Sequence, residues 1–139
     1  MRGAACPTPD WRMSVSAMSA HTILVVDDSP LERGFLVELL GHSGYTVITA
    51  DNGEEALDQA RLRRPALVVL DVVMPGASGF QVVRALSRDP QTSEIPVILC
   101  TGKDTEVDRI WGLRQGARDY VTKPVHGETL LSKIAELVK

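Results

Sequence analysis

The sequence predicts an α/β domain in which five parallel β-strands alternate with five α-helices. Three strand-like segments (23–26, 66–70 and 97–100) are continuously apolar, and two others (46–50 and 119–122) mix polar and apolar residues. Continuous apolar strands are typical of a sheet covered on both faces, and mixed strands are typical of its edges. The strict alternation of strand and helix favours a parallel sheet with right-handed crossovers.

Capping signals and apolar spacing predict where the first helix lies. Ser29 is a suitable N-cap, Pro30 suits the first helical position, and Glu32 is expected to close a capping box with Ser29. Gly41 to Gly44 ends the helix. The apolar residues expected to face the core from this helix are Leu31, Phe35, Leu39 and Leu40.

The remaining helices carry the same kinds of signal. Asn52 and Ser78 are the expected N-caps of the second and third helices, and Asp104 or Thr105 caps a fourth helix that Gly116 closes. The fourth helix is expected to place Val107, Ile110 and Trp111 on one face. The fifth helix carries apolar residues at helical spacing, namely Leu130, Leu131, Ile134, Leu137 and Val138.

Length and composition favour a disordered leader, residues 1–20, followed by one domain with a full core, residues 21–139. The net charge of -3 gives no electrostatic reason to expect nucleic acid or a membrane surface as a partner. No apolar segment approaches the roughly 18 residues of a membrane span. Cys6 lies in the leader and Cys100 in an apolar strand, with no metal or disulfide spacing, so we expect a cytoplasmic protein.

Polar residues stand where four of the predicted strands end. Asp27 and Asp28 follow the first strand, Asp71 ends the third, Thr101 ends the fourth and Lys123 follows the fifth. Because the carboxyl ends of parallel strands meet at one edge of the sheet, where ligands bind, these side chains are expected to gather there.

This set of residues favours phosphoryl chemistry. Clustered carboxylates repel one another unless a cation lies among them, so Asp27, Asp28 and Asp71 suggest a Mg²⁺ site. A carboxylate can itself be the nucleophile and form an aspartyl phosphate, and Asp71 is the best placed to attack. Lys123 would neutralise phosphoryl oxygens and Thr101 would donate its hydroxyl to them. Taken singly, each residue is more simply a turn former, a buried hydroxyl or a solvated charge.

The joint motif resembles the receiver domain of two-component response regulators, the CheY-like family, over about residues 22–139. The resemblance implies a flavodoxin-like (βα)5 three-layer sandwich whose five-stranded parallel sheet has the order 2-1-3-4-5. The residues that carry the resemblance are Asp27-Asp28, Asp71 with Met74-Pro75 and Gly79, Thr101, and Lys123-Pro124.

The resemblance also implies roles for individual residues. Asp71 would be the phosphoacceptor, which takes a phosphoryl group from the phosphohistidine of a histidine kinase. Lys123 would contact that phosphoryl group, and the bond between Lys123 and Pro124 would be cis. The implied magnesium ligands are Asp28, Asp71, the backbone carbonyl of Val73 and, through water, Asp27.

Thr101 and Tyr120 resemble the hydroxyl and aromatic switch pair of the family. Their movement would remodel the face made by the fourth helix, the fifth strand and the fifth helix, which a downstream protein partner binds. The segment from Thr101 to Tyr120 resembles the twitching-motility regulators of type IV pili. Since no further domain is expected after the fifth helix, the chain is similar to single-domain, chemotaxis-type regulators. The resemblance also implies a monomer or a weak dimer that pairs through the face of the fourth helix.

Two other functions compete with this phosphoacceptor switch, which is expected to have only aspartyl-phosphate autochemistry and not to be an enzyme. A Mg²⁺-dependent phosphatase with an Asp nucleophile usually carries a second acid two residues later, where this chain has Val73. A pseudo-receiver that binds partners without phosphorylation would be expected to lack some of the polar residues, yet all are present. Since Val73 cannot orient a hydrolytic water, we also expect slow self-dephosphorylation.

Overall fold

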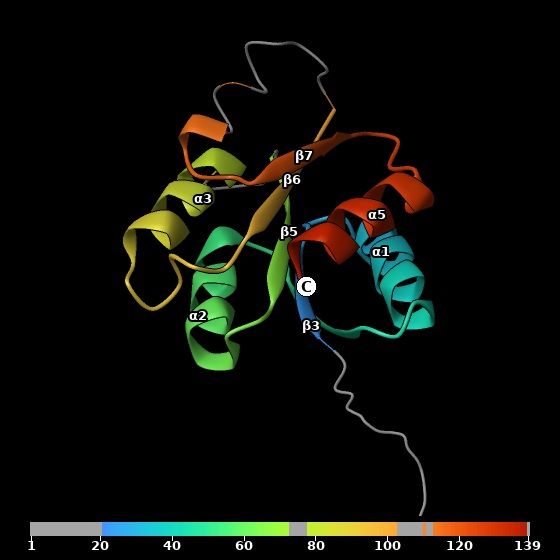
Figure 1. Cartoon of the computed structure of the whole chain (residues 1–139), viewed down its shortest axis with the longest axis horizontal. Coiled ribbons are helices and arrows are strands. Elements are labelled where there is room, and N and C mark those ends of the chain that lie inside the picture. Colours follow the sequence, from blue (N-terminus) through green and yellow to red (C-terminus); the bar gives the residue numbers. More distant parts are fainter. Residues whose placement is uncertain (1–20, 73–77, 103–109, 111–112, 139) are drawn as a thin grey trace, which may run out of the picture.

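A five-stranded parallel sheet lies between helices on both of its faces (Figure 1). The computed structural model describes residues 21–72, 78–102, 110 and 113–138. The leader and most of the expected fourth helix lie outside these described residues. The elements in chain order are β3 (Thr22–Val26), α1 (Pro30–His42), β4 (Thr46–Ala50), α2 (Gly53–Arg63), β5 (Leu67–Asp71), α3 (Gly79–Arg88), β6 (Val97–Thr101), β7 (Asp119–Thr122) and α5 (Gly127–Leu137).

The sheet order is β4-β3-β5-β6-β7, which in chain order is 2-1-3-4-5. Every pair of neighbouring strands is parallel. This topology confirms the predicted flavodoxin-like fold. The two strands with a mixed pattern, β4 and β7, are the edge strands, and the three continuously apolar strands are central.

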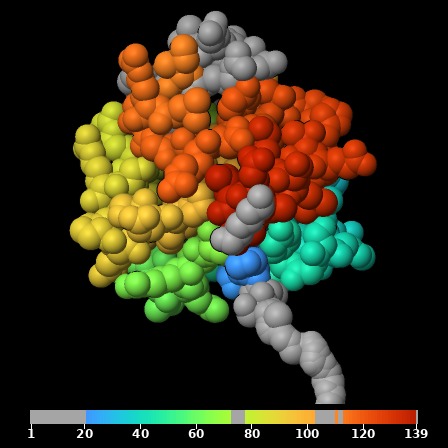
Figure 2. Space-filling model, viewed as in Figure 1, coloured from blue at the N-terminus to red at the C-terminus, as the bar shows by residue number. Residues whose placement is uncertain are grey.

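Alternate residues of the central strands build two separate cores. In β3, Leu24 and Val26 pack in the cluster that contains α2 and α3, whereas Ile23 and Val25 pack in the cluster that contains α1 and α5. Successive side chains of a strand point to opposite faces, so a sheet covered on both faces needs apolar residues at every position. Figure 2 shows the two helix layers from outside, with α2 and α3 (green and yellow) on one side and α1 and α5 (teal and red) on the other.

The apolar stripe expected for α1 is partly wrong. The structure buries Leu36 and Leu40 against the sheet, while Leu31 is 85% exposed and Phe35 is 50% exposed. Leu31 and Phe35 form one row of the helix, and Leu36 and Leu40 form a neighbouring row about 100° away. The sheet contacts the second row, so Leu31 and Phe35 at the start of α1 are left on the surface, whereas Leu39 further along the helix is partly buried against the core.

The N-caps predicted for α2 and α3 are present. The Asn52 side chain caps α2, and Ser78 and Gln81 form both hydrogen bonds of a capping box at the start of α3. In α5, Leu130 and Ile134 are fully buried, as their spacing predicts. None of the helices in the described ranges has the length and apolar character needed to cross a membrane.

Candidate functional site

Four strands end together at one edge of the sheet. Asp27 directly follows β3, Asp71 is the last residue of β5, Thr101 is the last residue of β6, and Lys123 directly follows β7. The strand register aligns these ends, because Asp71 pairs with Cys100, the neighbour of Thr101. Residues far apart in the sequence are therefore brought to one place by the parallel topology.

Three carboxylates form the acidic part of the site. Asp27, Asp28 and Asp71 each offer an oxygen, and these oxygens lie within 4.8 Å of one another. Asp27 and Asp71 are only 2% and 5% exposed, whereas Asp28 is exposed. Two buried carboxylates this close need a counter-charge, and a set of oxygen donors suits a hard cation such as Mg²⁺. The donor chemistry of the site thus fits the implied ion.

Burial raises the pKa of Asp27 to about 6, and the nearby Asp71 carboxylate adds to the rise. The Ser29 backbone N–H donates to Asp27 Oδ1 at 2.9 Å and offsets part of this rise. Arg33 Nη1 donates to the Asp27 backbone carbonyl at 2.8 Å. These two contacts join the first turn of α1 to the end of β3, so the Asp27 carboxylate is fixed although its charge is unfavourable there.

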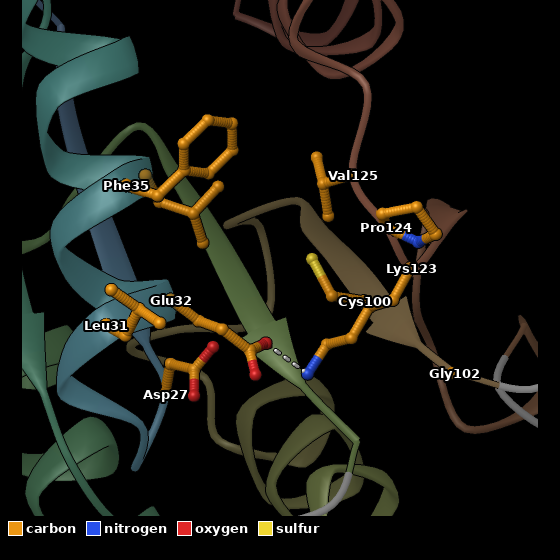
Figure 3. A pocket seen from close by; sticks show the side chains of 10 residues that line it. Asp27, Leu31, Glu32, Phe35, Cys100, Gly102, Lys123, Pro124 and Val125 are labelled. Carbon is orange, nitrogen blue, oxygen red and sulfur yellow. Dashed lines mark ion pairs between the residues drawn. The ribbon is translucent and has the colours of Figure 1, made fainter.

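Lys123 supplies the positive charge of the site. Its Nζ lies 3.1 Å from Asp71 Oδ1 and 2.6 Å from Glu32 Oε1, and Figure 3 shows the Glu32 pair as a dashed line. Burial alone would lower the pKa of the Lys123 ammonium, but the hydrogen bonds that it donates to Glu32 and Asp71 outweigh burial and raise the pKa. The Lys123 backbone N–H donates to the Thr101 carbonyl at 2.8 Å, and the Lys123–Pro124 peptide bond is cis.

Glu32 is the site residue that sequence reasoning missed. The spacing of Ser29 and Glu32 predicts a capping box, and the Glu32 N–H does donate to Ser29 Oγ at 3.3 Å. The Ser29 N–H, however, donates to Asp27 instead of to Glu32. The Glu32 carboxylate points to Lys123, which comes from the opposite end of the chain (Figure 3). The capping box predicted at α1 is therefore wrong: the hydrogen bond from the Ser29 N–H to the Glu32 carboxylate is absent, and that carboxylate forms an ion pair with Lys123.

Gly79 lets α3 begin directly against the backbone of Asp71. Its N–H donates to the Val72 carbonyl at 2.8 Å. A Cβ atom at this position would lie 2.5 Å from the Asp71 carbonyl oxygen and 2.7 Å from Val72 Cα. Only glycine fits this approach without displacing the backbone that carries the Asp71 carboxylate.

The two residues of the expected switch pair lie on neighbouring strands. Thr101 is 7% exposed at the carboxyl edge of β6. Tyr120 lies within β7, paired with Leu99, and its ring packs against the core under α2 and α3. Lys133 Nζ lies 5.9 Å from the centre of the Tyr120 ring and bonds both carboxylate oxygens of Asp119 at 3.0 Å. Tyr120 therefore contacts α5 as well as the core.

Some of the expected residues lie outside the described part of the chain. They include the Val73 carbonyl, Met74-Pro75, and the segments 103–109 and 111–112 of the expected fourth helix. Cys100 is buried, and burial raises the pKa of its thiol to about 12. Cys100 therefore belongs to the core under α1 and α5.

A groove of about 820 Å³ opens beside the carboxylates, between the start of α1 and the segment that follows β7 (Figure 3). Its walls include Leu31 and Phe35, the exposed large apolar residues of α1, and Val125. Glu32 and Lys123 line the groove as well. The surface next to the reactive edge is thus largely apolar, with charged groups on its wall.

A family model for the response regulator receiver domain matches residues 23–135. The chain therefore belongs to the response regulator receiver domain family, as the sequence predicts, and is a receiver-domain signalling protein.

Among individual relatives, the chain is 53% identical to Protein PilH of Pseudomonas aeruginosa over 112 residues, which cover 81% of this chain and 93% of PilH. It is 39% identical over 118 residues to the transcriptional regulatory protein AfsQ1 of Streptomyces coelicolor, covering 85% of this chain but only 51% of AfsQ1. Among solved structures, the chemotaxis response regulator CheY4 of Vibrio cholerae matches with a TM-score of 0.81 and 32% identity, over 86% of this chain and 99% of CheY4.

Proposed function

We propose that this chain is a phosphoacceptor response regulator in which Asp71 takes a phosphoryl group from a histidine kinase. The observation that carries the proposal is the Lys123 ammonium 3.1 Å from Asp71, in a site where three carboxylates lie within 4.8 Å of one another. Asp28 and Asp71 would hold Mg²⁺ directly with the Val73 carbonyl, and Asp27 would act through water.

The chemistry of the transfer is a displacement at phosphorus. An oxygen of Asp71 attacks, the P–N bond of the phosphohistidine breaks, and its electron pair stays on the imidazole nitrogen. When bound, Mg²⁺ supplies positive charge to the phosphoryl oxygens. Lys123 adds a second positive charge 3.1 Å from Asp71 Oδ1, and the Ser29 N–H holds the Asp27 carboxylate in place by a hydrogen bond.

Thr101 and Tyr120 then respond to the phosphoryl group on Asp71 and transmit the change to the protein surface. The Thr101 hydroxyl moves to the phosphoryl oxygens, and the Tyr120 ring turns into the space this opens. The surface that changes is made by β7, α5 and the expected fourth helix, where a downstream protein partner binds. The similarity to PilH and the resemblance of the segment 101–120 to twitching-motility regulators support control of motility.

The groove beside the site suits a protein phosphodonor. The donor histidine has to approach Asp71, and the exposed side chains of Leu31 and Phe35 on α1 line the groove beside the site. Exposed apolar side chains grouped around a reactive edge are typical of a protein contact. A small phosphodonor such as acetyl phosphate does not need this contact. Comparison of its reaction with transfer from a kinase therefore distinguishes an effect on docking from an effect on phosphoryl transfer.

Incubation with acetyl phosphate and Mg²⁺, followed by intact mass measurement, tests the proposal. We expect one retained phosphoryl group on the wild-type chain and none on Asp71→Asn. Continuous turnover without a retained group would favour the Mg²⁺-dependent phosphatase, against which the apolar Val73 argues. Absence of both modification and turnover would favour a pseudo-receiver and would refute the proposal.

A further inference from the structure

We infer that Glu32 is a positioning residue that shares Lys123 with Asp71 and restrains the phosphorylation of Asp71. The inference rests on the proposed function and adds to it a regulator of the same site. It is carried by the geometry of one nitrogen between two carboxylates: Lys123 Nζ contacts Glu32 Oε1 at 2.6 Å and Asp71 Oδ1 at 3.1 Å.

The Glu32 carboxylate is free to make this contact because its usual partner is occupied. In the capping box at α3, the side chain of Gln81 accepts from the N–H of Ser78. At α1 the equivalent N–H, that of Ser29, donates to Asp27. The first turn of α1 therefore presents a carboxylate to the site in place of a closed cap, and the shortest ion pair at Lys123 is the one with Glu32.

The consequence for phosphoryl transfer is electrostatic. A lysine ammonium has three N–H donors, so it can bind both carboxylates at once, but its charge is then shared between them. A phosphoryl group that arrives at Asp71 needs that charge and meets the negative charge of Glu32 nearby. Glu32 thus holds the ammonium beside Asp71 and at the same time opposes the build-up of negative charge there.

The size of the effect follows from the contact distances. Since both contacts share Nζ, the two carboxylate oxygens lie no more than about 6 Å apart. The side chain of Glu32 is 47% exposed, so a high effective dielectric constant applies. At an effective dielectric constant of about 40 to 80, removal of the Glu32 charge should accelerate phosphorylation by an anionic donor by about three- to tenfold.

The experiment compares Glu32→Gln with wild type and with Glu38→Gln, using acetyl phosphate at saturating Mg²⁺ and intact mass to follow the rate. Glu38 is an exposed acid on the same helix, so its variant controls for the change in net charge. We expect Glu32→Gln and Glu32→Ala to be about three- to tenfold faster, Glu32→Asp to remain close to wild type, and Glu38→Gln to be unchanged. The gain should shrink as KCl is raised, because added salt screens the charge of Glu32.

The two hypotheses fail in different ways. If wild type takes up a phosphoryl group but both Glu32→Gln and Glu32→Ala match it, or are slower, the inference about Glu32 is wrong and the proposed function stands. A gain that persists undiminished at high salt would also overturn it, because a charge effect must be screened. If wild type itself takes up no phosphoryl group, the proposed function fails.

Discussion

Replacement of Asp27 by asparagine should stabilise the metal-free protein. Asp27 is 2% exposed, and its pKa is raised from 3.8 to about 6 by burial first and then by the adjacent Asp71 carboxylate. Because the folded pKa lies above the unfolded one, the folded state binds the proton more tightly. Stability therefore falls as the pH rises from about 4 to about 6, and the loss persists at neutral pH.

The magnitude follows from the pKa difference. At about 1.4 kcal/mol for each pKa unit, ionisation of Asp27 costs up to about 3 kcal/mol of folding free energy. Because the neighbouring Asp28 is exposed, solvent reaches this part of the site and screens the Asp27 charge, which lowers that cost. We expect Asp27→Asn to raise the free energy of unfolding in EDTA by about 1 to 3 kcal/mol near neutral pH. The asparagine Oδ1 can still accept from the Ser29 N–H, so the local hydrogen bond survives.

Urea denaturation in EDTA measures this effect near neutral pH and again at about pH 4, where Asp27 is protonated in the wild type and the advantage should largely disappear. Asp58→Asn, an exposed acid of α2, controls for net charge. Added Mg²⁺ should stabilise wild type more than Asp27→Asn, since the ion offsets repulsion that the variant lacks. A variant no more stable than wild type in EDTA, or one with the same gain at both pH values, would refute the reasoning.

Two further perturbations test the backbone and the groove. Gly79→Ala should lower the free energy of unfolding by about 1 to 3 kcal/mol, because the new Cβ meets the Asp71 backbone, whereas Gly34→Ala in open space on α1 should raise it by about 0.5 to 1 kcal/mol. Urea denaturation checks both, and equal effects at the two glycines would contradict the close approach. Leu31→Ser with Phe35→Ser should slow transfer from the cognate kinase about fivefold or more but leave acetyl phosphate reactions unchanged. Leu62→Ser, at an apolar residue that is 76% exposed on α2, is the control, and equal losses with both phosphodonors would count against docking.

The fold could be predicted from the sequence because its signals are local. Continuous apolar strands mark the centre of the sheet, and the mixed segments became β4 and β7 at its edges. The residues at the strand ends were found for the same reason: once the strands are parallel, their carboxyl ends must meet, as Asp27, Asp71 and Lys123 do.

What could not be predicted depends on contacts between distant segments. The apolar rows of α1 that contain Phe35 and Leu36 look alike in the sequence, and only docking on the sheet decides that Leu36 is buried. Glu32 fits a local capping pattern in the sequence. In the structure, however, Asp27 accepts the Ser29 N–H that Glu32 was expected to bind, and the Glu32 carboxylate pairs with Lys123 instead. Both departures lie at the start of α1, where the helix meets the site.

The most direct test of the central claim locates the phosphoryl group. After reaction with acetyl phosphate and Mg²⁺, reductive trapping of the acyl phosphate and peptide mapping should place one modification at Asp71. We expect this modification not to form when EDTA has removed the metal beforehand, and to be absent from Asp71→Asn. A modification at another residue, or one that forms equally well in EDTA, would contradict a metal-assisted phosphoacceptor built from Asp71 and its neighbouring carboxylates.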